Sequence, residues 1–184
     1  MILRRKKMTD IFIVGSSGSG KIGQLVRNRL SETYDITYFC GNRIERFGTG
    51  YNLLVFDCEA PILSGISGGI VLLEQGGRLP ETLPKNCTAI INSDDKAHRR
   101  ILRARGIPTV ACGLSDTATI SFTSETDDTL MVSLNRELTA LSGKKIEPLE
   151  IPVQKCGADN YSLMSFTALR LLLDDFDSEL GKLI

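Results

Sequence analysis

A glycine-rich segment near the start of the chain has the composition of a loop that binds phosphate. Its sequence is Ile11-Phe-Ile-Val-Gly-Ser-Ser-Gly-Ser-Gly-Lys-Ile-Gly23, between an apolar run and a stretch with helical periodicity. Small residues let backbone N–H groups approach an anion, and a helix N-terminus adds partial positive charge. The candidate binding residues are Gly15, Ser16, Ser17, Gly18, Ser19, Gly20, Lys21 and Ile22.

One template for such a loop is G-x-x-x-x-G-K-[ST], in which the final hydroxyl is a ligand of Mg²⁺. Gly15, Gly20 and Lys21 satisfy this template, but Ile22 stands where Ser or Thr belongs. The backbone and the Lys21 ammonium remain able to hold the phosphates of ATP or ADP. We therefore expect phosphate binding with weak Mg²⁺ coordination.

Ile22 also lies on a helical stripe with Val26 and Leu30, at intervals of four residues. We therefore expect its side chain to turn inward to the core rather than toward the loop.

A second template, G-x-G-x-x-G, is typical of dinucleotide-binding proteins. Gly18, Gly20 and Gly23 satisfy it, and Arg43 follows the next predicted strand, where it would suit the phosphorylated ribose of NADP. A glycine-rich turn without any ligand is a third interpretation.

A carboxylate after an apolar run favours the triphosphate template. Four apolar residues precede Asp57, and Glu59 follows two residues later. In nucleoside triphosphatases, a carboxylate at such a strand end holds Mg²⁺ or its water. Asp57 is therefore the candidate metal ligand, although acidic residues also commonly end strands.

These residues need an α/β framework to bring them together. Apolar runs alternate with two stretches of helical periodicity, which predicts a three-layer fold with a mostly parallel sheet. Shorter runs within 117–153 predict a small antiparallel section. The expected strands are 10–14, 35–40, 52–56, 70–73, 89–91, 109–112, 117–123, 130–134 and 148–153; the expected helices are 21–31, 94–105 and 160–174. Residues 1–9 form a basic tail, and residues 10–184 a single domain.

Composition excludes several classes of function. Lys+Arg and Asp+Glu both number 22 among 184 residues, so the net charge is zero and a generic nucleic-acid binder is not expected. His98 is the only histidine, and no C-x-x-C occurs among five cysteines. No apolar run approaches the length of a membrane span, and no signal peptide is evident, so we expect a cytoplasmic protein.

The predicted helix over 94–105 has two further features. Ser93 or Asp94 could cap it, and Asp94 and Asp95 are interpreted as capping acids rather than ligands. One face is basic, which is typical of a solvated surface and secondarily of contact with an anionic partner. The basic residues are Arg99, Arg100, Arg103 and Arg105.

Taken in order, several segments resemble the central ATPase domain of the Mur ligase family, the ATP-dependent amide-bond ligases of cell-wall precursor synthesis. They are the loop with Lys21, Gly41-Asn42, Leu53–Asp57, Ile90–Asp95, Thr109–Asp116, Ile151–Val153 and Gly157–Asn160. The resemblance implies a phosphate-loop domain in which Asn160 contacts the adenine side of a nucleotide. From the residues alone, Asn160 is equally well suited to cap the last helix.

The departures from the family pattern concern the metal and the chemistry. Ile22 replaces a metal-binding Thr, Asp57 a glutamate, and Asp159 a histidine, and we expect a stand-alone domain without the family's flanking domains. The first hypothesis is a nucleotide-binding module with weak or no catalysis. The second is an active ligase or ATPase that a protein partner completes, and the third is an NADP-binding protein.

Overall fold

The computed structural model describes residues 8–15, 18–50, 52–177 and 182–183. The helices are α1 (Lys21–Arg29), the 3₁₀ helix η1 (Leu30–Glu32), α2 (Lys96–Ala104) and α3 (Asn160–Leu172). The strands are β1 (Thr9–Val14), β2 (Ile36–Cys40), β3 (Arg43–Phe47), β4 (Leu53–Cys58), β5 (Gly69–Leu73), β6 (Cys87–Asn92), β7 (Thr109–Cys112), β8 (Ile120–Glu125), β9 (Thr129–Leu134), β10 (Leu138–Thr139), β11 (Lys145–Ile146), β12 (Leu149–Gln154), β13 (Phe176–Asp177) and β14 (Lys182–Leu183).

One large sheet carries the fold, with strand order β12-β9-β8-β7-β6-β5-β1-β4-β2-β3. The seven adjacent strands β8-β7-β6-β5-β1-β4-β2 are parallel to one another. At one end of the sheet β3 pairs antiparallel with β2, and at the other end β9 pairs antiparallel with β8 and β12 with β9. The predicted α/β fold, with a mostly parallel sheet and an antiparallel section within 117–153, is confirmed.

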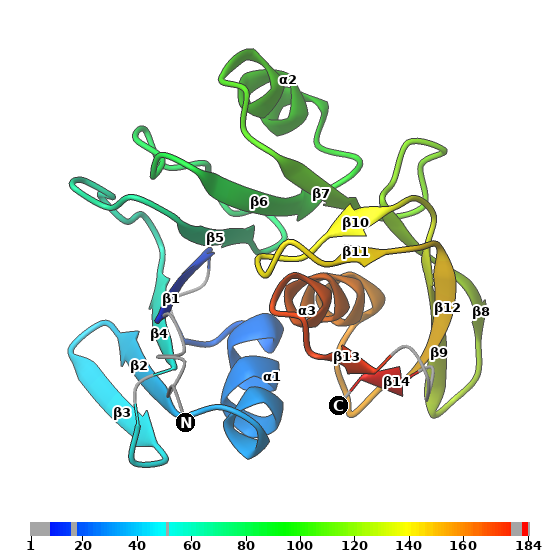
Figure 1. Ribbon diagram of the computed structural model, residues 1–184, viewed down its shortest axis with the longest axis horizontal. Coiled ribbons are helices and arrows are strands. Elements are labelled where there is room, and N and C mark those ends of the chain that lie inside the picture. Colours follow the sequence, from blue (N-terminus) through cyan, green and yellow to red (C-terminus); the bar gives the residue numbers. More distant parts are fainter. Residues whose placement is uncertain (1–7, 16–17, 51, 178–181, 184) are drawn as a thin grey trace.

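Helices lie on both faces of this sheet (Figure 1). The sheet curves around α1 and α3, and α2 lies on the opposite face. The central strand β1 is buried on both faces: Ile11 and Ile13 belong to the core under α1 and α3, whereas Phe12 and Val14 belong to the core on the side of α2. Such burial explains why β1 has a continuous apolar sequence rather than an alternating one.

Strand β3 was not predicted, because none of its residues is fully buried and three of its five residues are charged. Its Ile44 is 69% exposed. It pairs with β2 through a two-residue loop in which Gly41 has φ +54°. Gly41-Asn42, interpreted above as a family motif after a strand, is therefore the turn of a β-hairpin.

Two boundaries differ from prediction in ways that matter for the site. Strand β4 continues to Cys58, so Asp57 lies inside the strand rather than at its end. Asp95, not Ser93 or Asp94, is the N-cap of α2, and its Oδ1 accepts a hydrogen bond from the His98 backbone N–H at 2.9 Å. In the described part of the chain, every helix is too short or too polar to cross a bilayer.

Candidate functional site

The glycine-rich loop joins the carboxyl end of β1 to α1, as predicted. The Gly15 N–H donates to the Cys58 carbonyl at 3.1 Å, and Gly18 has φ +83°, which only glycine adopts without a steric penalty. Gly20 is the N-cap of α1 in extended conformation and has no side chain with which to cap the helix. The backbone N–H groups of a first helical turn lack partners within the helix, and such groups can donate to an anion.

The first turn of α1 carries one cation and no acid of its own. The cation is Lys21, the first residue of the helix, which is exposed. The Ser19 carbonyl accepts a hydrogen bond from Gln24 Nε2 at 3.4 Å. The other two candidates, Ser16 and Ser17, lie outside the described residues.

Ile22 faces the core and not the loop. It is 1% exposed and belongs to the same buried cluster as Val26 and Leu30. The inward orientation predicted from the shared helical stripe is confirmed. Position 22 therefore offers neither an oxygen nor an accessible side chain to a metal ion.

Asp57 is buried against α1 at 1% exposure. The Tyr38 hydroxyl donates a short hydrogen bond to its Oδ2, and its Oδ1 has no partner among the described residues. A Cβ on Gly23 would lie 2.5 Å from that Oδ2 and 2.6 Å from the Tyr38 hydroxyl oxygen. Glycine at position 23 thus allows α1 to lie this close. Burial and then the bond to Asp57 raise the pKa of Tyr38, so its hydroxyl keeps the donated proton.

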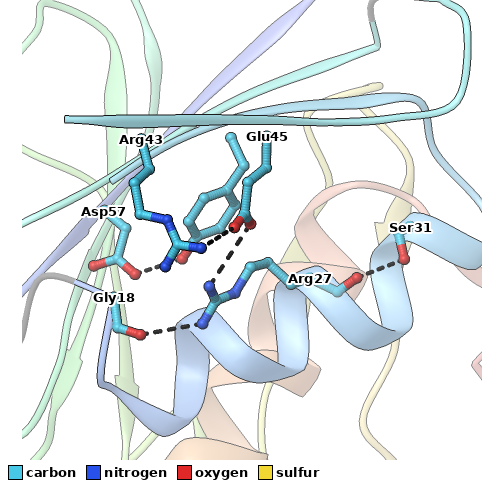
Figure 2. Close-up of polar contacts among 7 residues, drawn as sticks. Gly18, Arg27, Ser31, Arg43, Glu45 and Asp57 are labelled. Atoms are coloured by element: carbon cyan, nitrogen blue, oxygen red, sulfur yellow. Dashed lines mark hydrogen bonds and ion pairs between the residues drawn. The ribbon is translucent and has the colours of Figure 1, made fainter. Parts of the chain in front are cut away.

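Arg27 connects the loop to the outer strands. Figure 2 shows its guanidinium between the Gly18 carbonyl and Glu45: Nη2 donates to Gly18 O at 3.1 Å, and Nη1 lies 3.7 Å from Glu45 Oε2. The guanidinium carbon also lies 5.2 Å from the centroid of the Tyr38 ring. Arg43 is engaged by the same acid, 3.6 Å from Glu45 Oε1. These contacts hold the loop against β2 and β3.

An acidic residue that sequence analysis did not select lies against the loop. Glu74 directly follows β5 and is 8% exposed. A Cβ on Gly15 would lie 2.7 Å from Glu74 Cβ, and one on Gly20 would collide with the carboxylate. Glycines 15 and 20 thus make room for this side chain. An acid after the apolar run 70–73 is the signal that identified Asp57, and it could have identified Glu74.

Asn160 does not cap the last helix. Asp159 is the N-cap of α3, and its Oδ1 accepts from the Ser162 N–H at 2.9 Å. Asn160 instead donates from Nδ2 to Glu125 Oε2 at 2.9 Å. Hydrogen bonds from Lys155 first and then from Asn160 lower the pKa of Glu125. The capping interpretation of Asn160 is wrong, and its contact with adenine stays a prediction.

The residues present do not fit a Mg²⁺ site. Across the described ranges, no group of three or more His, Cys, Asp or Glu is placed to hold a metal ion. Mg²⁺ requires a nearly ideal octahedral shell and keeps several waters. Asp57 is buried, with one oxygen bonded to Tyr38, and Ile22 is apolar.

Comparisons with known proteins give a structural match only. No protein-family model matches the sequence, and no curated protein matches it. Among solved structures, the fold is similar to that of a MurF ligase from Thermotoga maritima in complex with ADP, with a TM-score of 0.57 and 13% identity. The match covers 95% of this chain and 48% of the MurF chain, so this chain spans about half the length of that ligase. The chain has a Mur-ligase-like fold.

Proposed function

We propose that this chain is a nucleotide-binding module that holds the phosphates of ATP or ADP on the backbone of residues 15–21 and hydrolyses them slowly or not at all. The main supporting observation is the loop between the central strand β1 and α1, in which Gly20 is the N-cap and has no side chain that could cap the helix. Lys21 supplies a positive charge beside it. The ADP bound by the MurF ligase of similar fold supports this choice of ligand.

The strand order favours ATP or ADP over NADP. In dinucleotide-binding folds, the second strand lies next to the first and carries the ribose-binding residue. Here β4 lies between β1 and β2. Arg43, the proposed partner of the NADP phosphate, lies beyond β2 on β3 and pairs with Glu45. Gly23, the third glycine of the dinucleotide template, is required for the close packing of α1 against Asp57 and Tyr38 and needs no dinucleotide to explain it.

Slow or absent hydrolysis follows from the metal ligands. Phosphoryl transfer depends on Mg²⁺ to neutralise charge on the transferred group. Asp57 and Ile22 do not supply the expected ligands, and the Glu74 carboxylate against the loop opposes the approach of another negative charge. We expect weak, Mg²⁺-independent binding.

Isothermal titration with ATP, ADP and NADP, each with and without Mg²⁺, tests the proposal. We expect heat with ATP and ADP, a clear reduction of binding in Lys21→Ala, and no change in Lys85→Ala. Lys85 is a suitable control because it is exposed and precedes β6, at the amino ends of the parallel strands, whereas the loop follows the carboxyl end of β1. No heat with any ligand at millimolar concentration would refute the proposal, and heat with NADP alone would replace it.

Turnover measurements separate the module from an active ligase or ATPase. We expect negligible ATP hydrolysis in the wild type and a stronger Mg²⁺ dependence of binding in Ile22→Thr, with some loss of stability because position 22 is buried. Robust hydrolysis that Lys21→Ala abolishes would show instead a working enzyme. Turnover that appears only with an added protein would favour the partner-completed form.

A further inference from the structure

A basic hollow lies beside α2. The sheet face that carries α2 is the one opposite α1 and α3 (Figure 1). The volume of the hollow is about 480 Å³, within the range of small-molecule sites. One wall is the flank of α2, the floor comes from β7 and the segment before β8, and the far wall is Arg136 after β9. The cationic lining residues are Lys96, Arg99, Arg100, Arg103 and Arg136.

These five cations have no acidic partners within the described chain. Every ion pair there involves other basic residues. Arg99 donates to the Ser93 carbonyl at 3.3 Å, which anchors it without neutralising it. With a net charge of zero for the whole chain, this cluster is a local separation of charge rather than a general basic excess.

The helix carries this charge at a cost. Lys96 is the first residue of α2, where the helix N-terminus is itself positive. Lys96, Arg100 and Arg103 follow at intervals of four and three residues, which places like charges side by side on one flank. An anion in the hollow would relieve this repulsion.

Apart from Ile107, the uncharged residues that line the hollow are small, and most of them are polar. Thr109 and Ala111 project from one face of β7, while the intervening Val110 lies in the core of the other face. Thr119 is 8% exposed, and its hydroxyl oxygen accepts from the Ala111 N–H at 3.4 Å, which leaves its own proton available to an acceptor. A protein-docking face would present larger apolar side chains here.

We propose that this hollow is a second anion site, separate from the glycine-rich loop, and that it binds a small compound with two or more linked phosphate groups. Guanidinium groups match phosphate oxygens in pairs of parallel hydrogen bonds. Arginines on α2 and Arg136 on the opposite wall would contact different phosphates of one ligand. The volume of about 480 Å³ matches a small molecule rather than a polymer.

The test titrates the full chain with inorganic pyrophosphate and tripolyphosphate in the Lys21→Ala background, which weakens phosphate binding at the loop and leaves the hollow intact. We expect one site in this background, with affinity reduced about tenfold or more by the further substitutions Arg100→Ala/Arg103→Ala and about threefold by Arg136→Ala. Arg43→Ala in the same background serves as the control, because Arg43 lies on the far edge strand β3. The control should bind as tightly as Lys21→Ala alone. Thermal melting without ligand checks that each variant is folded.

Three results would overturn the proposal. Loss of binding in Lys21→Ala with retention in Arg100→Ala/Arg103→Ala would place the polyphosphate on the loop. Unchanged binding in Arg136→Ala would show that only the solvated face of α2 contacts the ligand and that the hollow is not a site. Tighter binding of a single-stranded RNA than of tripolyphosphate at about 0.2 M salt, through the same arginines, would make the surface a nucleic-acid contact.

Discussion

The charged residues on the two faces of the sheet differ in sign and in burial. Around the glycine-rich loop, two acids are buried within the fold: Asp57 accepts a hydrogen bond from Tyr38, and Glu74 packs against Gly15 and Gly20. On the face of α2, five cations line an open hollow and have no acidic partner among the described residues. The region with a recognisable motif therefore buries its acidic groups, and the region without a motif exposes its cations to a ligand.

The largest expected effect tests the internal partner of Asp57. Tyr38→Phe removes the donor to a buried carboxylate and should lower the free energy of unfolding by about 3 kcal/mol. Denaturant unfolding measures this. In the Asp57→Asn background the same substitution should cost clearly less, since no charge then needs the hydroxyl; equal costs would contradict the interpretation.

The close approach of α1 to β4 predicts the next effect. Gly23→Ala places a methyl group 2.5 Å from Asp57 Oδ2, and we expect a net loss of about 2 kcal/mol, with overpacking exceeding the gain in helix propensity. Gly68→Ala is the control, because its Cβ would meet only the Asn86 carbonyl, at 4.0 Å. Similar melting temperatures for both variants would show that α1 can shift at no cost.

Glu74→Gln tests whether its carboxylate opposes binding at the loop. Removing one negative charge beside the phosphates should tighten ATP and ADP binding by about tenfold at low salt. Titration calorimetry provides the measurement, and Glu81→Gln, an exposed acid in a distant loop, provides the control. Weaker binding in Glu74→Gln would instead assign Glu74 a supporting role at the site.

The two residues at the start of α3 should differ in stability. Asp159→Ala removes the N-cap and should cost about 1 kcal/mol, whereas Asn160→Ala loses only a surface hydrogen bond to Glu125 and should cost less. Thermal unfolding compares them. If Asn160→Ala selectively weakens ATP binding, its predicted contact with adenine gains support; a larger stability loss than in Asp159→Ala would reverse the assignment.

The smallest expected effect concerns the hollow without ligand. Arg103→Gln relieves like-charge repulsion and should stabilise the free chain by about 0.3 kcal/mol, an effect that added salt reduces. Arg43→Gln, which loses its ion pair with Glu45, should not stabilise. Denaturant melts at low and high salt check both, and destabilisation by Arg103→Gln would mean that this arginine has a structural partner.

Several features could be predicted from local sequence, because each depends on neighbouring residues. Alternating apolar runs and helical stripes predicted the parallel sheet with its helices, and the order of the segments predicted the Mur-ligase-like fold. The shared stripe of Ile22, Val26 and Leu30 predicted that Ile22 turns inward. Strand β3 was not predicted from the sequence because an exposed edge strand needs no apolar face. The two-residue turn at Gly41 could have indicated a β-hairpin.

The sequence by itself determined the loop, the absence of a hydroxyl at position 22 and the basic face of α2. Only the tertiary structure decided which residues lie opposite the loop, position 22 and the basic face of α2. Strand order placed Glu74 beside Gly20 and Tyr38 beside Asp57, and the return of the chain after β9 placed Arg136 opposite α2. Such pairings join residues far apart in the chain, and they arise from the packing of whole strands and helices rather than from local pattern.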